Sequence, residues 1–188
     1  MSNFFVEGIL HITEFEGYDH MLFLLAMCSP FTFSDWKKVL WLATAFTLGH
    51  SISLALAALD AIRFSSAIIE FCIPVTIIIT AVYSLMRREK ITAQWASYCT
   101  TVIFGIIHGL GFSGYFRMIS SGGESFLAEL FLFNLGVEVG QLLILIAILC
   151  IVAVLTLTSK NIAKHMSKII ALPTLVTALW LAFEKWPF

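Results

Sequence analysis

Charged residues are scarce in this chain. Only 12% of its 188 residues are Asp, Glu, Lys or Arg, whereas a soluble domain carries about 25%. Hydrophobic residues make up 60% of the sequence, and its mean hydropathy is +0.95. This composition excludes an ordinary soluble domain and predicts an integral membrane protein with the lipid bilayer as its surroundings.

The chain also lacks a basic excess, cysteine motifs and linkers. Its net charge of -1 argues against a nucleic-acid partner, because phosphates require Lys and Arg for neutralisation. Its four cysteines show no CxxC spacing, so neither a disulfide framework nor a thiolate zinc site is indicated. We expect them to pack in buried positions. No Pro/Ser-rich or low-complexity stretch divides the sequence, which predicts a single transmembrane domain over 1–188.

Long apolar segments are abundant. Six of them approach the roughly 20 residues that a spanning helix needs. They lie at 8–29, 38–59, 65–86, 95–117, 126–157 and 167–184. The first is the weakest, because its leading half is polar. The expected fold class is all-α, a polytopic membrane helix bundle of about six transmembrane helices.

The distribution of Lys and Arg predicts the orientation of this bundle. The loops after the first, third and fifth segments hold eight of these residues, and the remaining loops and ends hold three. The eight are Lys37, Lys38, Arg87, Arg88, Lys90, Lys160, Lys164 and Lys168. Since cytoplasmic loops are enriched in positive charge, both termini are expected on the outer, periplasmic side of a bacterial inner membrane.

Ionisable side chains lie inside several of the apolar segments. They are His20, His50, Glu70, His108 and Glu138. Each costs at least about 2.5–3.5 kcal/mol in the hydrocarbon, so it usually faces the bundle interior and has a partner. At 1.5 Å of rise per residue, His50, Glu70, His108 and Glu138, together with Asn134, fall near the bilayer centre or in its outer half. This agreement in depth predicts one shared polar site, although a single intramembrane histidine often serves only as a hydrogen bond between helices.

The first segment poses a geometric question. His11 and His20 are nine positions apart, which places them on opposite sides of a straight helix. Either the helix breaks at Gly17, or only Asp19 and His20 reach the shared site. His11 therefore belongs to the set only if the helix breaks at Gly17.

Imidazole and carboxylate groups are ligands for divalent first-row metals, and nickel, cobalt and zinc all suit them. The sequence thus predicts an intramembrane metal site. The candidate ligands are His11, Asp19, His20, His50, His108 and Glu138, with Ser51, Ser53, Asn134 and Gln141 as supporting partners. Asn134, Glu138 and Gln141 share one helix stripe at i, i+4 and i+7 spacing.

Five blocks of the sequence are similar to one known family. They are His11-Ile, Gly17-x-Asp19-His20-x-Leu-Phe-Leu, Thr44-Ala-Phe-Thr-x-Gly-His50-Ser51, His108-Gly-Leu-Gly-Phe112 and Phe133-Asn-Leu-Gly-Val-Glu138-x-Gly-Gln141. The chain resembles the HupE/UreJ membrane proteins of the hydrogenase and urease accessory type. This resemblance implies a nickel or cobalt permease, in which the histidines and the Asp-His pair bind the ion during its passage.

Two other functions stay open at this point. An intramembrane zinc hydrolase would hold a metal-bound water and use Glu138 or Glu70 as general base. A non-transporting accessory subunit would use the polar groups only to join helices, within a homo-oligomer or a complex with an accessory protein. Metal binding separates the accessory subunit from the first two functions.

Overall fold

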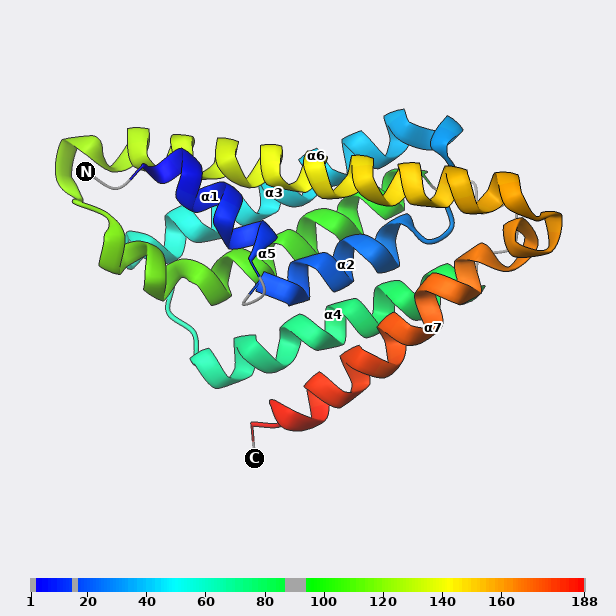
Figure 1. Cartoon of the computed structure of the whole chain (residues 1–188). Helices are drawn as coiled ribbons and strands as arrows, with labels where there is room; N and C mark the ends of the chain where they lie inside the picture. The colour runs from blue at the N-terminus through cyan, green and yellow to red at the C-terminus, as the bar shows by residue number, and fades with distance from the viewer. Residues whose placement is uncertain (1–2, 15–16, 87–93, 188) are drawn as a thin grey trace.

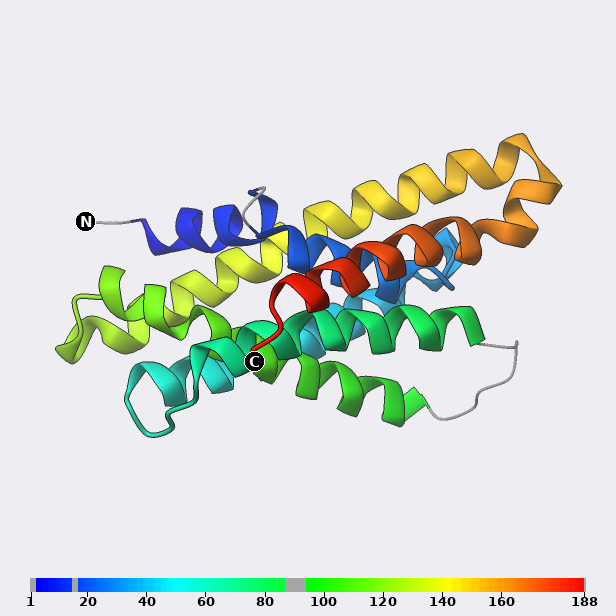
Figure 2. The ribbon, with the colours of Figure 1, turned by 90° about the horizontal axis from the view of Figure 1, so that it is seen from below.

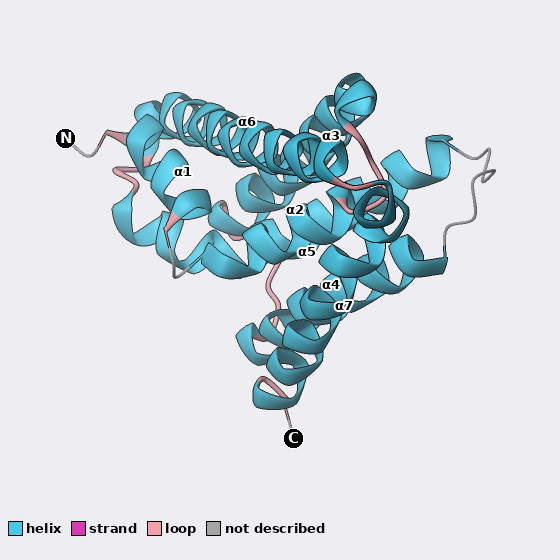
Figure 3. Cartoon of the chain, turned by 45° about the vertical axis from the view of Figure 1, so that its right-hand side comes forward, coloured by secondary structure: helices cyan, strands magenta, loops and turns pink. Residues whose placement is uncertain are grey.

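A computed structural model describes residues 3–14, 17–86 and 94–187 of the chain. Within these ranges the regular elements are helices, and no strand occurs (Figure 3). The α-helices are α1 (Phe4–Thr13), α2 (Tyr18–Cys28), α3 (Trp36–Ala58), α4 (Ser66–Met86), α5 (Gln94–Ile119), α6 (Phe126–Thr158) and α7 (Lys160–Glu184). Short 3-10 turns at Phe33–Asp35 and Gly123–Ser125 lead into α3 and α6. The all-α prediction is confirmed.

Five segments of the described chain are long and apolar enough to cross a membrane. They are Phe33–Ala58, Ser66–Met86, Ser97–Ile119, Gly123–Thr158 and Lys160–Glu184. They match the second to sixth predicted segments and confirm the membrane character of the chain. The predicted sidedness of the termini stays a prediction, and Arg87, Arg88 and Lys90, which contribute to it, lie outside the described residues.

The first predicted segment, 8–29, is divided into two helices. α1 has 10 residues and α2 has 11, so each is shorter than a spanning helix. The sixth predicted segment, 167–184, corresponds to α7, which begins earlier, at Lys160. Ser159 is extended and accepts a hydrogen bond from the Asn161 amide, which starts α7 directly after α6. The hydropathy of the sequence did not predict this first part of α7, because it contains several polar residues.

The short α2 lies in the middle of the molecule. Figure 1 shows α2 between the long α6 and the α4–α7 pair, and α2 contacts α4, α6 and α7. Figure 2 shows α1 lying along one end of α6. The most extensive contact joins α3 to α5, and α3 also packs against α6. Side chains of α2 therefore face a surrounding bundle at every level.

Glycines bring α3 and α5 into backbone contact. A Cβ on Gly49 would collide with the Val102 carbonyl, and one on Gly105 would collide with that of Phe46. Gly109 lies in the same way against His50. Because contact positions rise together along both chains, the two helices are parallel. Two spanning helices with one span between them, here α4, cross the membrane in the same direction. Their parallel packing places residue 50 beside residues 105 and 109.

The same device joins α1 to α6. A Cβ on Gly8 would meet the Phe133 carbonyl, and one on Gly136 would meet the carbonyl of Phe5. The closeness of these backbones fixes the depth of α1 on α6. His11, three residues after Gly8, is consequently held near Gly140 on the neighbouring helix, since Gly140 meets Ile9 and Ile12 on either side of it.

Burial of the cysteines differs from the expectation. Cys28 is buried and Cys72 half-buried, but Cys99 and Cys150 are exposed on the helix surface. All four are free thiols. An apolar context did not imply burial here, because the outer surface of a membrane helix bundle is itself apolar.

Candidate metal centre

Four histidines from four helices converge in the bundle. Ring centroids of His11 and His20 lie 4.8 Å apart, those of His20 and His108 5.0 Å, and those of His20 and His50 6.1 Å. His11 comes from α1, His20 from α2, His50 from α3 and His108 from α5. His20 contacts the other three rings, so it is the middle member of the cluster.

One nitrogen of each ring has no protein partner. The Nε2 atoms of His11, His20, His50 and His108 are buried without a hydrogen bond in the described structure. His50 and His108 are at most 1% exposed. An unpaired buried polar atom costs about 1–3 kcal/mol, and native structures rarely keep one without a role. Four such atoms in one cluster indicate a ligand that the protein itself does not supply.

The other nitrogen of three rings is held by an oxygen. His20 Nδ1 lies 2.8 Å from the Asp19 carboxylate, and His108 Nδ1 lies 2.8 Å from the Phe104 carbonyl. His50 Nδ1 lies 3.4 Å from Oδ1 of Asn134, whose amide group donates to Leu130 and thereby turns its oxygen toward the ring. Since these oxygens accept, each Nδ1 carries the proton in the neutral ring.

These partners leave the Nε2 lone pairs free to bind a cation. An imidazole that binds a metal commonly donates its other N–H to a carboxylate, carbonyl or amide oxygen, which fixes the tautomer and the ring orientation. His20, His50 and His108 all meet that condition. The supporting partners thus come from three different helices and from both backbone and side chains.

Three of the histidines fit around a single ion. The ligand atoms of His11, His20 and His50 all lie within 4.8 Å of one another. Nitrogen binds a divalent first-row metal at about 2.0–2.1 Å, so ligands of one ion lie at most about 4 Å apart. Ring movements of about 1 Å would close the group on an ion. His108, beside His20, stands next to this group and provides a further nitrogen.

The break between α1 and α2 makes this group of three. Gly17 packs against the backbone of His11 so closely that a Cβ would overlap the His11 carbonyl. The break between the two helices changes the direction in which the side chains of α2 point relative to those of α1. His11 and His20 therefore face one another. The alternative in which Gly17 breaks the helix and His11 joins the cluster is the one that the structure adopts.

Phenylalanines surround the imidazoles. Phe112 lies 3.8 Å from the His11 ring between centroids, Phe46 lies 5.1 Å from His108, and Phe133 stacks at 6.5 Å from His50. Phe46 and Phe133 are fully buried. This wall keeps water from the back of the rings and lowers the local dielectric, so an ion bound there interacts strongly with its ligands.

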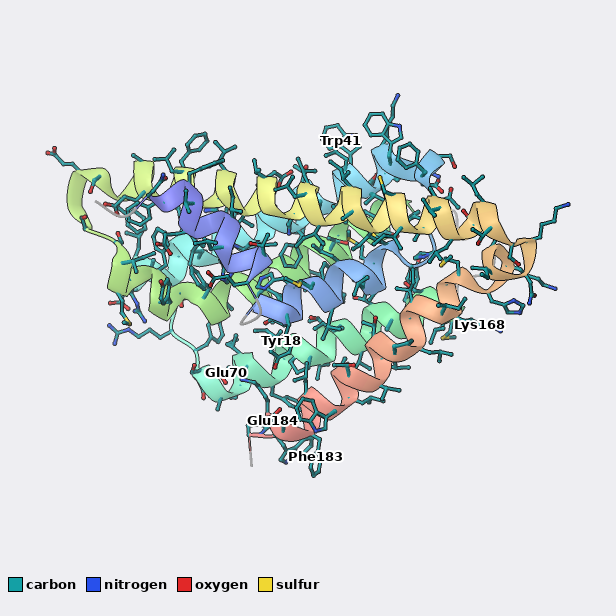
Figure 4. All side chains as sticks on the ribbon, viewed as in Figure 1. Tyr18, Trp41, Glu70, Lys168, Phe183 and Glu184 are labelled. Carbon is teal, nitrogen blue, oxygen red and sulfur yellow. The ribbon has the colours of Figure 1, made fainter. Side chains whose placement is uncertain are left out.

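A cavity leads to the cluster from the α4 and α7 side. It has a volume of about 680 Å³, and its lining includes His11, His20 and His108. Four carboxylates also line it, namely Glu7, Glu14, Asp19 and Glu70, together with the ammonium of Lys185. Figure 4 shows Tyr18, Glu70 and Glu184 at the same end of the bundle, with Lys168 toward the opposite end. The cavity is therefore acidic along its approach to the imidazoles.

The structure places the predicted carboxylates outside the group of three histidines. Asp19 contacts the ring and the backbone amide of His20, at 2.8 and 2.7 Å. Glu138 accepts a 2.6 Å hydrogen bond from Thr44 on α3. Glu70 is half exposed and accepts from Ser66 and from Lys185, at 3.2 and 3.0 Å. In this geometry Asp19 would reach an ion at the histidines only through His20.

The predicted supporting residues divide in the same way. Asn134 contacts His50. Ser53 donates to the His50 carbonyl and Ser51 to the Thr47 carbonyl, so both are bonded to backbone oxygens. Gln141 accepts a 2.8 Å hydrogen bond from Thr47, and its own Nε2 is buried without a partner in the described structure.

Two functional partners escaped sequence reasoning. The Phe104 carbonyl orients His108, and Phe112 covers His11. The position four residues before a helical histidine is a signal for the first. It is a weak one, because the exposed His165 bonds the Asn161 carbonyl in the same manner. What separates the two histidines is burial, which the local sequence does not specify.

Comparison with known proteins agrees with the blocks found in the sequence. A search of curated proteins and a search of solved structures each found no match to the chain. A family model described as HupE / UreJ protein matches residues 1–185, which is almost the whole chain and includes each histidine of the cluster. The chain belongs to the HupE/UreJ family of membrane proteins.

Proposed function

We propose that this protein is a permease for a divalent transition metal, nickel or cobalt, which binds at the histidine cluster during its passage. The observation that carries the proposal is the set of four buried Nε2 atoms without partners in the described structure, on histidines of which three bring a ligand nitrogen each within 4.8 Å of the others. Membership of the HupE/UreJ family supports it. Metal ions are the substrate in this proposal.

The donor set favours late first-row metals. Neutral imidazoles bind nickel, cobalt, copper and zinc, whereas magnesium, calcium and manganese prefer carboxylate and water oxygens. The three grouped ligands are all imidazoles, and Asp19 adds a negative charge one hydrogen bond away. We therefore expect nickel and cobalt to compete with zinc, and magnesium to be rejected even in large excess.

The cavity supplies the route to the cluster. Four carboxylates against one ammonium give its lining an excess of negative charge, which attracts cations and raises their local concentration. In the orientation predicted from the Lys and Arg residues, this cavity opens to the outer side. A hydrated ion would enter there, exchange water for His20 first, and then draw in His11 and His50.

The hydrolase alternative receives less support. A metallohydrolase needs a base beside the metal-bound water. The two candidate bases, Glu138 and Glu70, are engaged with Thr44 and with Lys185 and Ser66 respectively. Neither belongs to the group of ligand atoms within 4.8 Å. Transport needs no such base. The histidine ligands and the cavity are sufficient for it.

Uptake of nickel or cobalt into proteoliposomes tests the proposal. We expect the wild-type protein to load vesicles, and the double variant His50→Ala/His108→Ala to lose both uptake and bound metal. His165→Ala is the matched control, because this histidine is exposed and lies outside the cluster. Unchanged uptake in the double variant would refute the proposal. Bound metal without uptake would favour the hydrolase or the accessory subunit, and absence of bound metal would leave a structural role.

A further inference from the structure

A second cavity, of about 250 Å³, lies beyond the histidines at the other end of α2. We propose that this inner cavity is the chamber into which the ion is released, and that Phe23 is the barrier between it and the metal centre. The inference rests on the proposed transport function. It identifies a second site on the path and the side chain that an ion must pass.

The position of the inner cavity follows from the residues on its walls. On α2 it lies past His20, at Phe23 and Met27, and on α5 it lies before His108, between Ser97 and Phe104. On α4 it is reached near Ser84, far along the helix from Glu70. The acidic cavity and the inner cavity are therefore on opposite sides of the histidine cluster.

The barrier between the two is one aromatic side chain thick. Phe23 lines the inner cavity, and the centroid of its ring lies 5.6 Å from that of His108. Its neighbours are Phe46 at 4.8 Å and Phe104 at 6.1 Å between centroids. Phe23 is 1% exposed. A rotation of this ring is the smallest movement that would join the histidines to the chamber.

Most of the lining of the inner cavity is apolar, and a few hydroxyl groups lie among its aromatic and aliphatic side chains. Thr80 donates to Thr76, Ser84 donates to Ala26, and Thr101 donates to Ser97, each to a backbone carbonyl at 2.8 Å. With their hydrogens committed, these oxygens present lone pairs, which accept hydrogen bonds from the water shell of a cation. No carboxylate is among the described lining residues. A chamber with so few ligand atoms would hold a rehydrated ion weakly and release it.

Phe104 connects the barrier to the metal centre. Its side chain lines the inner cavity, and its carbonyl holds His108 Nδ1 at 2.8 Å. A shift of α5 that moves Phe104 away from Phe23 would also disturb the orientation of His108. A movement of α5 would therefore open the barrier and weaken the contact of His108 with the metal at the same time.

The first test removes the barrier. In Phe23→Ala we expect metal uptake into proteoliposomes to rise about tenfold, the change that about 1.4 kcal/mol of lost barrier height produces. Metal bound per protein in detergent should stay at the wild-type level, because Phe23 offers no ligand atom. Phe131→Ala, at a phenylalanine that is 67% exposed on α6, is the matched control and should transport as the wild type does.

The second test fills the chamber. Thr80→Trp places a large ring in the inner cavity, and we expect uptake to fall about tenfold or more with metal binding intact. Val82→Trp, on the same helix but outside the described lining, should leave uptake unchanged. Thermal unfolding of each variant in detergent identifies any that fail to fold.

Failure of this inference is distinguishable from failure of the transport proposal. If the wild-type protein transports nickel or cobalt while Phe23→Ala and Thr80→Trp both transport at the wild-type rate, the chamber and its barrier are wrong and the permease stands. If the wild-type protein moves no metal, the permease itself is wrong. Loss of metal binding in a folded Thr80→Trp would also overturn the inference, since the chamber would then not be separate from the metal centre.

Discussion

Two polar regions line the same acidic cavity, and they are built in opposite ways. At the histidine cluster, buried rings keep one nitrogen each without a protein partner. At the rim, Glu70 and Lys185 satisfy one another at 3.0 Å, with 48% and 40% of their side chains exposed. Unpaired atoms in a dry setting indicate a ligand, whereas a wet ion pair between α4 and α7 is complete without one.

Removal of the central imidazole should have the largest effect. His20 contacts the other three histidine rings. Loss of a supporting partner lowers metal affinity about 10–100-fold. In His20→Ala we expect a larger loss, which brings metal binding down to about the limit of detection. Glu70 lines the same cavity but lies outside the group of three ligand histidines, so Glu70→Gln should lower metal affinity far less. Isothermal titration with nickel or cobalt measures both. Equal losses in the two variants would abolish the distinction between the regions.

Displacement of His11 should have the next largest effect. In Gly17→Ala the new methyl group overlaps the His11 carbonyl, so the α1–α2 junction has to shift, at a cost of about 1–3 kcal/mol in stability. Metal affinity should fall with it, because His11 leaves the group of three. Gly114→Ala on α5 meets nothing within 4 Å and is the control. Wild-type affinity in Gly17→Ala would exclude His11 as a ligand.

Loss of the charge behind His20 should have an intermediate effect. Asp19→Asn keeps the size of the side chain but removes the negative charge that supports the ring, so metal affinity should drop about 10–100-fold. The matched control is Asp60→Asn, at a position with φ of 57° that asparagine tolerates. Complete loss of binding in Asp19→Asn would instead make Asp19 a direct ligand, as the sequence had suggested.

The smallest effect is expected at the rim. Lys185→Gln removes an exposed ion pair and should lower stability by at most about 1 kcal/mol, with little change in metal affinity. The hydrogen bond to Glu70 raises the pKa of Lys185. The contribution of the pair is therefore complete below the ordinary lysine range and is lost as pH rises through the raised pKa.

Melting temperatures of wild type and Lys185→Gln, compared near neutral and at strongly alkaline pH, test this sign. The two should differ slightly near neutral pH and converge at alkaline pH. A difference that grows as the pH rises would contradict the assigned pair.

The membrane fold was largely predictable from the sequence, because length and apolarity alone define spans such as Ser66–Met86. The agreement in depth of His50, His108 and Glu138 also predicted a shared site. The break between α1 and α2 was recognised only as one of two alternatives, since a straight helix and a broken one have the same composition. The place of Glu138 was not predictable, because its contact with Thr44 depends on how α3 packs against α6.

The division of the first segment also bears on how the chain is assembled. α1 has 10 residues, so it extends about 15 Å, half of the hydrocarbon thickness. Non-helical backbone at membrane depth needs protein or water around it, and Gly17 and Glu14 face the cavity. The surface that receives α1 belongs to α6, which is synthesised far later. The packing surface of α1 is therefore missing until α6 has been made, so the first helix of the chain reaches its final contacts late in assembly.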